Sequence, residues 1–181
     1  MKRPSLVILD RDGVINADSD NYIRSPADWI PLPGSIEAIA RLHRAGIPVT
    51  IATNQSGIAR GYFSRSTLYR IHAKLRRAVR AAGGDIAAIA FSPYGPNDNS
   101  DCRKPRPGMV IRLLRRFHVT AEQAILIGDS SRDLAAAEAA GVPAWLVLTG
   151  NGKAALAGEP KPAAVYPDLA AATDALLELP V

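Results

Sequence analysis

The chain has 181 residues, 48% of them hydrophobic, and is long enough to bury a core as one globular domain spanning residues 1–181. A single cysteine, Cys102, excludes an internal disulfide and favours a cytoplasmic protein. No apolar run reaches the roughly 20 residues of a membrane span, and the first one is too short for a signal peptide. The net charge of +5 favours an anionic partner (nucleic acid, an acidic membrane surface or a phosphorylated small molecule) or a solubilising surface.

Apolar runs alternate with longer amphipathic segments along the chain. In order, the pattern predicts a strand at 5–9, a helix at 34–45, a strand at 48–53, a helix at 64–82, a strand at 86–91, a helix at 107–117, a strand at 124–128, a helix at 132–141, a strand at 144–148 and a short helix near 168–178. This alternation predicts an α/β fold with a parallel sheet between two helical layers. The continuous apolar strands agree, because parallel strands are buried on both faces.

The segment 64–82 gives the clearest helical signal, with Ser64 as its N-cap. Two histidines, His43 and His72, lie on or beside apolar helix faces, so we interpret them as packing residues rather than ligands. The basic residues of segment 64–82 predict a solvated face, with an anion-binding face as the alternative; they are Arg70, Lys74, Arg76, Arg77 and Arg80.

Polar residues follow three of the predicted strands. Asp10 and Asp12 follow the first strand, Thr53 follows the second, and Asp129 follows the strand at 124–128. The carboxyl ends of parallel strands share one edge of a sheet, where ligands bind. Carboxylates gathered there repel one another unless a cation lies among them, and hard oxygen ligands favour Mg²⁺. With Lys104 on a nearby loop, the set suits phosphoryl transfer.

Arg11 stands between the two aspartates of the first cluster. Because side chains alternate along a strand, Arg11 is predicted to point to the side opposite Asp10 and Asp12. We therefore assign it no catalytic role.

Four motifs carry a resemblance to a known family. They are DRDG at 10–13, TNQSG at 53–57, CRKP at 102–105 and GDSSRD at 128–133. Over about residues 5–150 the chain resembles phosphatases of the haloacid dehalogenase (HAD) superfamily. The resemblance implies a Rossmann-like three-layer sandwich around a parallel sheet. The chain has no room for the inserted cap domain of larger members, so loops must form the pocket walls.

The resemblance implies a role for each motif residue. Asp10 would be the nucleophile that forms an aspartyl-phosphate, and Asp12 the general acid and base. Mg²⁺ would be held by Asp10, the backbone carbonyl of Asp12, and Asp129. Thr53 would hydrogen-bond the phosphoryl oxygens, and Lys104 would neutralise their charge.

Other residues are implied in support of that centre. Asp133 would order the surroundings of the metal or orient Lys104. Arg60 and Arg103 are candidates for a second, non-reacting phosphate. The full set of expected substrate-binding residues is Asp18, Asp20, Tyr22, Asn54, Gln55, Ser56, Arg60 and Arg103.

The chain departs from its relatives at a zinc loop and after Asp129. Many relatives carry four zinc ligands before the RKP motif, and this chain has Ser92, Tyr94, Ser100 and Cys102 there. A structural zinc site needs all four ligands, so zinc is not expected and turn chemistry should hold the loop 93–101. Ser130 stands where some relatives have lysine, which leaves the fine specificity open.

The longer strings LDRDGVIN, TNQSGIARGYF and CRKPRPGM resemble a branch that acts on heptose bisphosphate or on histidinol phosphate. They imply Mg²⁺-dependent hydrolysis of the 7-phosphate of a heptose 1,7-bisphosphate, in the synthesis of ADP-heptose for lipopolysaccharide. The alternatives are histidinol-phosphate hydrolysis and phosphate binding without catalysis. The partner is expected to be a small sugar phosphate, not nucleic acid or a membrane, because aromatic residues for base stacking are few. A monomer is expected.

Overall fold

The structure is a computed structural model that describes residues 2–180. Its strands are β1 (Leu6–Leu9), β2 (Val49–Asn54), β3 (Ala88–Ser92), β4 (Ala124–Gly128), β5 (Ala144–Val147) and β6 (Ala164–Tyr166). Its α-helices are α1 (Ser35–Arg44), α2 (Arg65–Ala81), α3 (Gly108–Phe117), α4 (Ser131–Ala139), α5 (Gly152–Ala155) and α6 (Leu169–Glu178). A short 3₁₀ turn, Ala121–Gln123, precedes β4.

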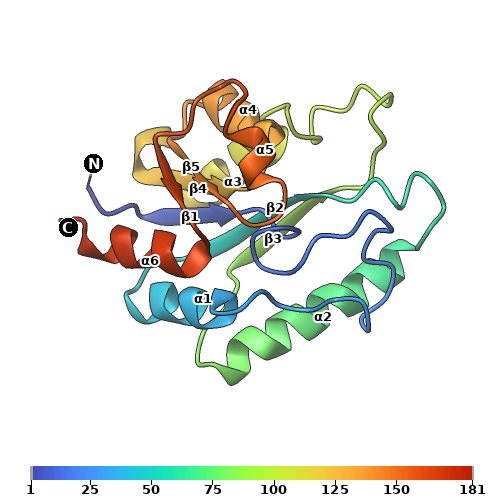
Figure 1. Cartoon of the computed structure of the whole chain (residues 1–181), viewed down its shortest axis with the longest axis horizontal. Helices are drawn as coiled ribbons and strands as arrows, with labels where there is room; N and C mark the ends of the chain where they lie inside the picture. Colours follow the sequence, from blue (N-terminus) through green and yellow to red (C-terminus); the bar gives the residue numbers. More distant parts are fainter. Residues whose placement is uncertain (1, 181) are drawn as a thin grey trace.

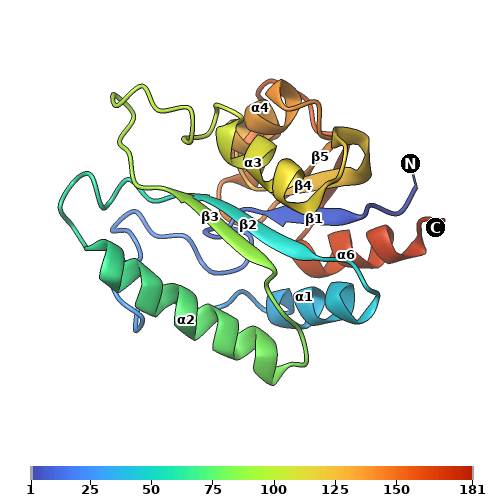
Figure 2. The same ribbon diagram turned by 180° about the vertical axis from the view of Figure 1, so that it is seen from behind.

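The six strands form one parallel sheet in the order β3-β2-β1-β4-β5-β6. Helices α1, α2 and α6 cover one face of this sheet, and α3, α4 and α5 cover the other (Figures 1 and 2). Val7 and Leu9 pack into the first core, whereas Leu6 and Ile8 pack into the second. All four β1 side chains are therefore buried, which explains the unbroken apolar run.

The strand order places the ends of β1, β2 and β4 side by side. β1 pairs with β2 on one side and with β4 on the other. The chain leaves β1 and β4 toward different layers, which opens a crevice between their carboxyl ends. No further domain is inserted between the elements of residues 2–180, so the loops 10–34 and 93–107 border this crevice.

The predicted elements are confirmed, with boundary shifts of a few residues at most. The strand predicted at 86–91 begins at Ala88, because Ile86 lies in an irregular segment between the end of α2 and the strand. β6 and α5 are missing from the prediction. β6 is a three-residue edge strand that is only partly buried, so it lacks a clear apolar pattern.

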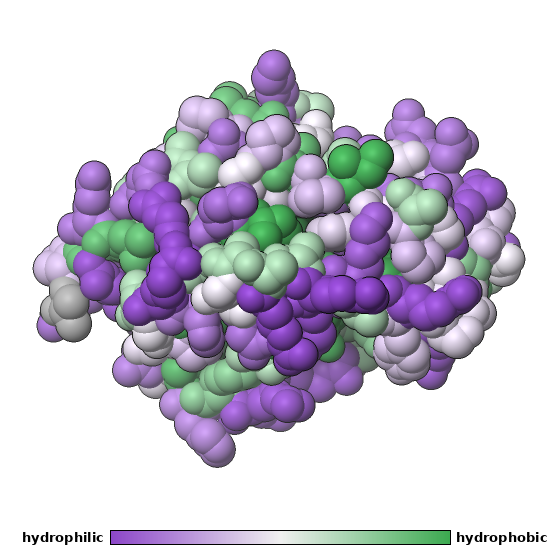
Figure 3. All heavy atoms as spheres, turned by 90° about the horizontal axis from the view of Figure 1, so that it is seen from below, coloured by the Kyte–Doolittle hydropathy of each residue, from purple (hydrophilic) through white to green (hydrophobic). Residues whose placement is uncertain are grey.

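Helix α2 keeps its predicted cap but not a uniformly solvated basic face. The Ser64 hydroxyl accepts a hydrogen bond from the backbone N–H of Thr67 at 3.1 Å. Lys74 donates to the carbonyls of Pro26 and Trp29 at 2.7 and 2.8 Å, and so fixes the loop before α1 against α2. Hydrophilic atoms cover most of the face seen from below in Figure 3, and hydrophobic areas there are broken up. No helix among residues 2–180 has the length and hydropathy of a membrane span.

Candidate active site

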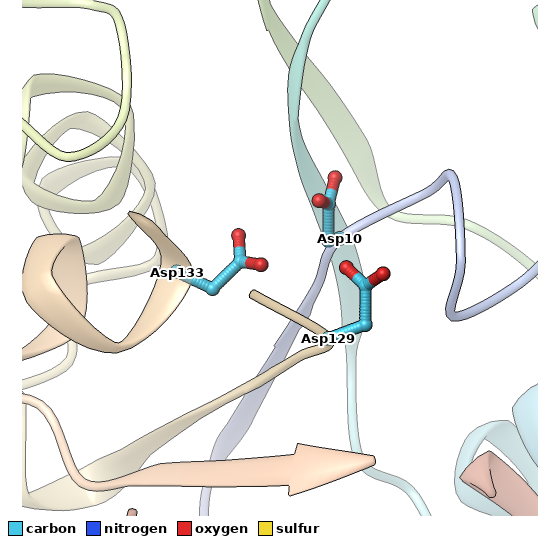
Figure 4. A group of neighbouring side chains, drawn as sticks. All are labelled: Asp10, Asp129 and Asp133. Atoms are coloured by element: carbon cyan, nitrogen blue, oxygen red, sulfur yellow. The ribbon is translucent and has the colours of Figure 1, made fainter. Parts of the chain in front are cut away.

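Three carboxylates meet at the end of the central strands. Asp10 directly follows β1, Asp129 follows β4, and Asp133 lies in the first turn of α4 (Figure 4). A carboxylate oxygen from each lies within 4.8 Å of one from each of the others. The backbone N–H of Asp10 donates to the carbonyl of Ile127 at 3.0 Å, so Asp10 remains anchored to the sheet.

Lys104 is the cation of this cluster. Its Nζ lies 3.0 Å from Oδ2 of Asp10 and 2.5 Å from Oδ1 of Asp133, and its side chain is only 2% exposed. Burial opposes the charged form, but the two carboxylates outweigh it and raise the pKa of Lys104. Asn54 holds the lysine's backbone: its Nδ2 donates to the Lys104 carbonyl at 2.9 Å, and its Oδ1 accepts from the Lys104 N–H at 3.1 Å. Asn54 thus positions Lys104, a contact that was not predicted from the sequence.

One lysine does not balance three carboxylates. Burial, with added repulsion from Asp133 and Asp129, raises the pKa of Asp10 to about 8 despite the attraction of Lys104. Burial and Asp133 raise the pKa of Asp129 to about 6, against a hydrogen bond from the backbone of Asn151. The donor set is all oxygen and carries excess negative charge, and it fits a hard divalent cation such as Mg²⁺.

Two glycines allow backbone to approach Asp129 closely. Gly13, with φ of +81°, and Gly150, with φ of +54°, each come so near that an added Cβ would lie 2.1 Å from Asp129 Oδ2. The hydroxyl of Thr149 donates to the carbonyl of Gly13 at 2.6 Å and joins the two loops. The glycine of the DRDG motif is therefore required by packing against Asp129 as well as by its turn.

Asp133 also shapes the start of α4. Its Oδ2 accepts hydrogen bonds from the backbone N–H and the hydroxyl of Ser130 at 3.1 and 2.6 Å, and its Oδ1 faces Lys104. The expectation that Asp133 orients Lys104 agrees with this contact. Ser130, at the position where some relatives have lysine, is used inside the protein as a helix cap.

Asp12 lies beside the cluster, and its carboxylate accepts hydrogen bonds from Arg11, Asn16 and Gln55. The prediction that Arg11 points to the opposite side was wrong. β1 ends at Leu9, so side-chain alternation no longer applies at Arg11. The chain turns after Asp10, and the fully buried side chain of Arg11 contacts the carboxylate of Asp12.

A pocket of about 320 Å³ opens above these groups. Every predicted site residue lines it, namely Asp10, Asp12, Asp18, Asp20, Tyr22, Thr53, Asn54, Gln55, Ser56, Arg60, Arg103, Lys104 and Asp129. Thr53 is buried at its base, where its hydroxyl accepts a hydrogen bond from Gln55 Nε2 at 2.9 Å. Asp18, Asp20 and Arg60 are exposed at its rim.

Six pocket residues were not predicted: Ser19, Ile23, Pro96, Ser130, Arg132 and Asn151. Asn151 joins Asp129 to Asp18 at the rim of the pocket. Its backbone N–H donates to Asp129 Oδ2 at 2.8 Å, and its Nδ2 donates to Asp18 Oδ2 at 3.0 Å. It follows β5, so the strand-end rule that selected Asp129 also applies to it.

Arg132 joins Arg60 and Arg103 at the pocket. Burial, together with the charges of Arg132 and Arg60, lowers the pKa of Arg103. Like charges are costly to hold together, so this group of arginines favours an anion in the pocket. Its sequence signal was present in the GDSSRD motif, since Arg132 lies one residue before Asp133 in the first turn of α4.

The loop 93–101 is held by short-range contacts. Asp98 Oδ2 accepts from the backbone N–H of Gly95 at 2.7 Å, and Arg103 donates to the carbonyl of Tyr94 at 3.0 Å. These contacts agree with the expected turn chemistry in this segment.

Comparisons with known proteins agree with this geometry. The family model described as HAD-hydrolase-like matches residues 101–172. The D-glycero-β-D-manno-heptose-1,7-bisphosphate 7-phosphatase of Bordetella bronchiseptica is 51% identical over 175 residues, 96% of this chain and 98% of that protein. The enzyme of that name from Pseudomonas aeruginosa is 50% identical over 176 residues, 96% of this chain and 98% of its own length.

A solved structure gives the same result. The crystal structure of D,D-heptose 1,7-bisphosphate phosphatase from B. bronchiseptica, complexed with magnesium and phosphate, has a TM-score of 0.93 and 51% identity. The match covers 98% of this chain and 99% of that one. The chain is therefore a phosphoric monoester hydrolase of the HAD superfamily, and it belongs to the family that contains these heptose-bisphosphate phosphatases.

Proposed function

We propose that the protein hydrolyses the 7-phosphate of D-glycero-β-D-manno-heptose 1,7-bisphosphate, in the synthesis of ADP-heptose for lipopolysaccharide. The observation that carries this proposal is the pocket itself: a carboxylate and lysine floor lies beneath arginines, in a chain half identical to enzymes of that name. The floor suits the reacting phosphate, and the arginines suit a second one.

In the first step, we propose that a carboxylate oxygen of Asp10 attacks phosphorus. An aspartyl-phosphate forms, and the bond from phosphorus to the sugar oxygen breaks. Asp12 gives its proton to the departing alkoxide, which leaves as the sugar alcohol. Lys104, which contacts Asp10, and Thr53 at the base of the pocket would hold the phosphoryl oxygens.

In the second step, water attacks the phosphorus of the aspartyl-phosphate. Asp12, now a carboxylate, removes a proton from that water, and the bond from Asp10 to phosphorus breaks. Phosphate leaves, and both aspartates return to their starting states. When bound by Asp10, Asp129 and the Asp12 carbonyl, Mg²⁺ supplies positive charge that stabilises the transferring group.

The phosphate that does not react needs its own partner. Arg60, Arg103 and Arg132 also line the pocket, and Asp18 and Asp20 offer acceptors for sugar hydroxyls. This division favours a sugar with two phosphates over histidinol phosphate, which carries a cationic amine in place of the second anion.

The direct test is kcat/KM, measured with Mg²⁺, for the β-heptose bisphosphate, its α-anomer and histidinol phosphate. A second phosphate held by arginine is worth about 10²-fold or more in kcat/KM. A preference of that size for the β-heptose bisphosphate over histidinol phosphate supports the proposal, and a preference for the α-anomer would change only the anomer proposed. Preference for histidinol phosphate would replace it with a role in histidine synthesis, and absent turnover of every phosphomonoester would favour phosphate binding without catalysis.

We also propose that the chain binds no structural zinc. Of the four positions that hold zinc ligands in many relatives, only Cys102 carries a ligand side chain, and turn contacts hold the loop 93–101. Metal analysis of the purified protein should find far less than one zinc per chain. One bound zinc per chain would overturn this expectation.

The remaining partner assignments also stay proposals. We propose a cytoplasmic monomer of one catalytic domain whose partner is the sugar phosphate alone. Sedimentation equilibrium should give the mass of one chain, 19.2 kDa, and a mass of two chains would contradict it.

A further inference from the structure

The guanidinium of Arg11 hydrogen-bonds the carboxylate of Asp12 from one side. Nε and Nη2 of Arg11 donate to Oδ1 of Asp12 at 2.9 and 2.7 Å, and Nη2 also lies 2.8 Å from Oδ2. The Arg11 side chain is 0% exposed, whereas the Asp12 side chain is 21% exposed and lines the pocket. The guanidinium thus contacts both oxygens from the protein side and leaves an edge of the carboxylate open to substrate.

A buried arginine is costly, so its position requires an explanation. Its charge is removed from water, and the one carboxylate within salt-bridge distance of its guanidinium among residues 2–180 is that of Asp12. Asn16 and Gln55 also donate to Asp12 at 2.9 Å each, but each contacts a single oxygen. A planar guanidinium that contacts both oxygens fixes the direction of a carboxylate as well as its charge.

His72 of α2 supports the far side of the guanidinium. Its Nε2 lies 3.4 Å from Nη1 of Arg11, and its ring packs edge-on against Phe91, with centroids 6.2 Å apart. Arg11 has only donors, so His72 must accept through an unprotonated Nε2 and is neutral in this contact. Burial and the Arg11 charge lower the pKa of His72 to about 3, in agreement with the neutral form.

We propose that Arg11 is a positioning residue, backed by His72, that aims the carboxyl of Asp12 at the oxygen leaving phosphorus. The inference rests on the acid and base role proposed for Asp12. Arg11 itself touches no substrate. Its effect is to keep Asp12 in the one direction from which a proton reaches the sugar oxygen.

This role predicts a dependence on the leaving group. A sugar alkoxide needs a proton to depart, whereas p-nitrophenolate departs without one. Loss of a correctly oriented general acid therefore lowers kcat/KM for the sugar phosphate much more than for p-nitrophenyl phosphate. A residue that only stabilises the fold would affect both substrates alike.

The experiment measures kcat/KM on both substrates for wild type, Asp12→Asn, Arg11→Met, Arg11→Lys and His72→Phe. Asp12→Asn sets the scale, with an expected loss on the order of 10²- to 10⁴-fold on the sugar phosphate and far less on the aryl phosphate. Arg11→Met should lose about 10- to 10²-fold on the sugar phosphate and under about threefold on the aryl phosphate. Arg11→Lys keeps the positive charge but not the planar guanidinium that contacts both oxygens of Asp12. It should therefore recover only part of the kcat/KM that Arg11→Met loses on the sugar phosphate.

His72→Phe keeps the bulk of the ring and should show the same pattern more weakly. Arg80→Met is the matched control, because Arg80 also lies on α2 and donates to the side chain of Asp85, away from the pocket. It should leave the ratio of the two kcat/KM values at the wild-type level.

Equal losses on both substrates in Arg11→Met or Arg11→Lys, with Asp12→Asn behaving as expected, would overturn this inference alone. Equal losses in Asp12→Asn would overturn the proposed role of Asp12, and this inference with it. If Arg11→Met does not fold, Arg11→Lys and His72→Phe decide the question by the same ratio.

Discussion

The floor and the rim of the pocket are built in opposite ways. The floor consists of Asp10 and Asp129 at the ends of β1 and β4, Lys104 on the loop 93–107, and Asp133 in the first turn of α4. Lys104, Asp129 and Asp133 are buried there, and the Asp10 side chain is 14% exposed. Asp18, Asp20, Arg60 and Arg132 form much of the rim, and all four are exposed on loops or at a helix start. The difference indicates that bond breaking depends on fixed charges, whereas recognition depends on side chains that water also reaches.

The largest effect is expected at the floor, from Asp10→Asn. The amide cannot form the proposed acyl phosphate, so phosphate release should fall on the order of 10⁴-fold or more for every substrate. Asp20→Asn at the rim is the control, and its loss should differ between substrates. Residual turnover near the wild-type rate in Asp10→Asn would assign the nucleophile elsewhere.

Lys104→Met tests whether the floor is also a structural unit. Removing the cation leaves two buried carboxylates without their partner, so the free energy of unfolding should drop by about 3 kcal/mol. Urea denaturation at pH 7 without Mg²⁺ measures it. Adding Asp133→Asn should recover part of the loss, and additive losses in the double variant would contradict the pairing.

The rim arginines should affect recognition and not bond breaking. Arg103→Ala or Arg132→Ala should lower kcat/KM for the heptose bisphosphate by about 10- to 10²-fold. Turnover of p-nitrophenyl phosphate, which has no second phosphate, should stay within about twofold of wild type. Arg112→Ala, outside this pocket, serves as the control. Equal losses on both substrates would erase the distinction between rim and floor.

The smallest effect concerns His72, which lies against Arg11. The folded chain keeps His72 neutral until about pH 3, whereas the unfolded chain binds a proton near pH 6.5. Acid therefore favours unfolding, and between pH 7.5 and 5.5 this group should lower the free energy of unfolding by about 1.4 kcal/mol. In His72→Gln, denaturation curves across this range should show a correspondingly flatter pH dependence. An unchanged pH dependence would mean that His72 titrates normally.

The same contrast separates what could be predicted from the sequence. Asp10 and Asp129 were predictable because the apolar strands before them have one plausible place, the middle of a parallel sheet. β6 and α5 were not, because a short edge strand and a single helical turn carry little periodicity.

Contacts between loops were harder to predict. Asn54 lines the pocket as expected, but its hydrogen bonds to the backbone of Lys104, 50 residues further along the chain, were not predicted. The direction of Arg11 was predicted wrongly because side-chain alternation was applied two residues beyond the end of β1. Such contacts depend on loop paths that neither periodicity nor motif spacing encodes, although Asn151 could have been found at the end of β5.

The central place of β1 and β4 bears on how the enzyme would fail under stress. Each has at least two further strands on either side in the sheet. Backbone in such a position opens only when the whole domain unfolds, whereas exposed loops open by themselves at much lower cost. Moderate heat or denaturant should therefore blur discrimination between substrates before hydrolysis stops, so that a stressed molecule becomes indiscriminate before it becomes inactive.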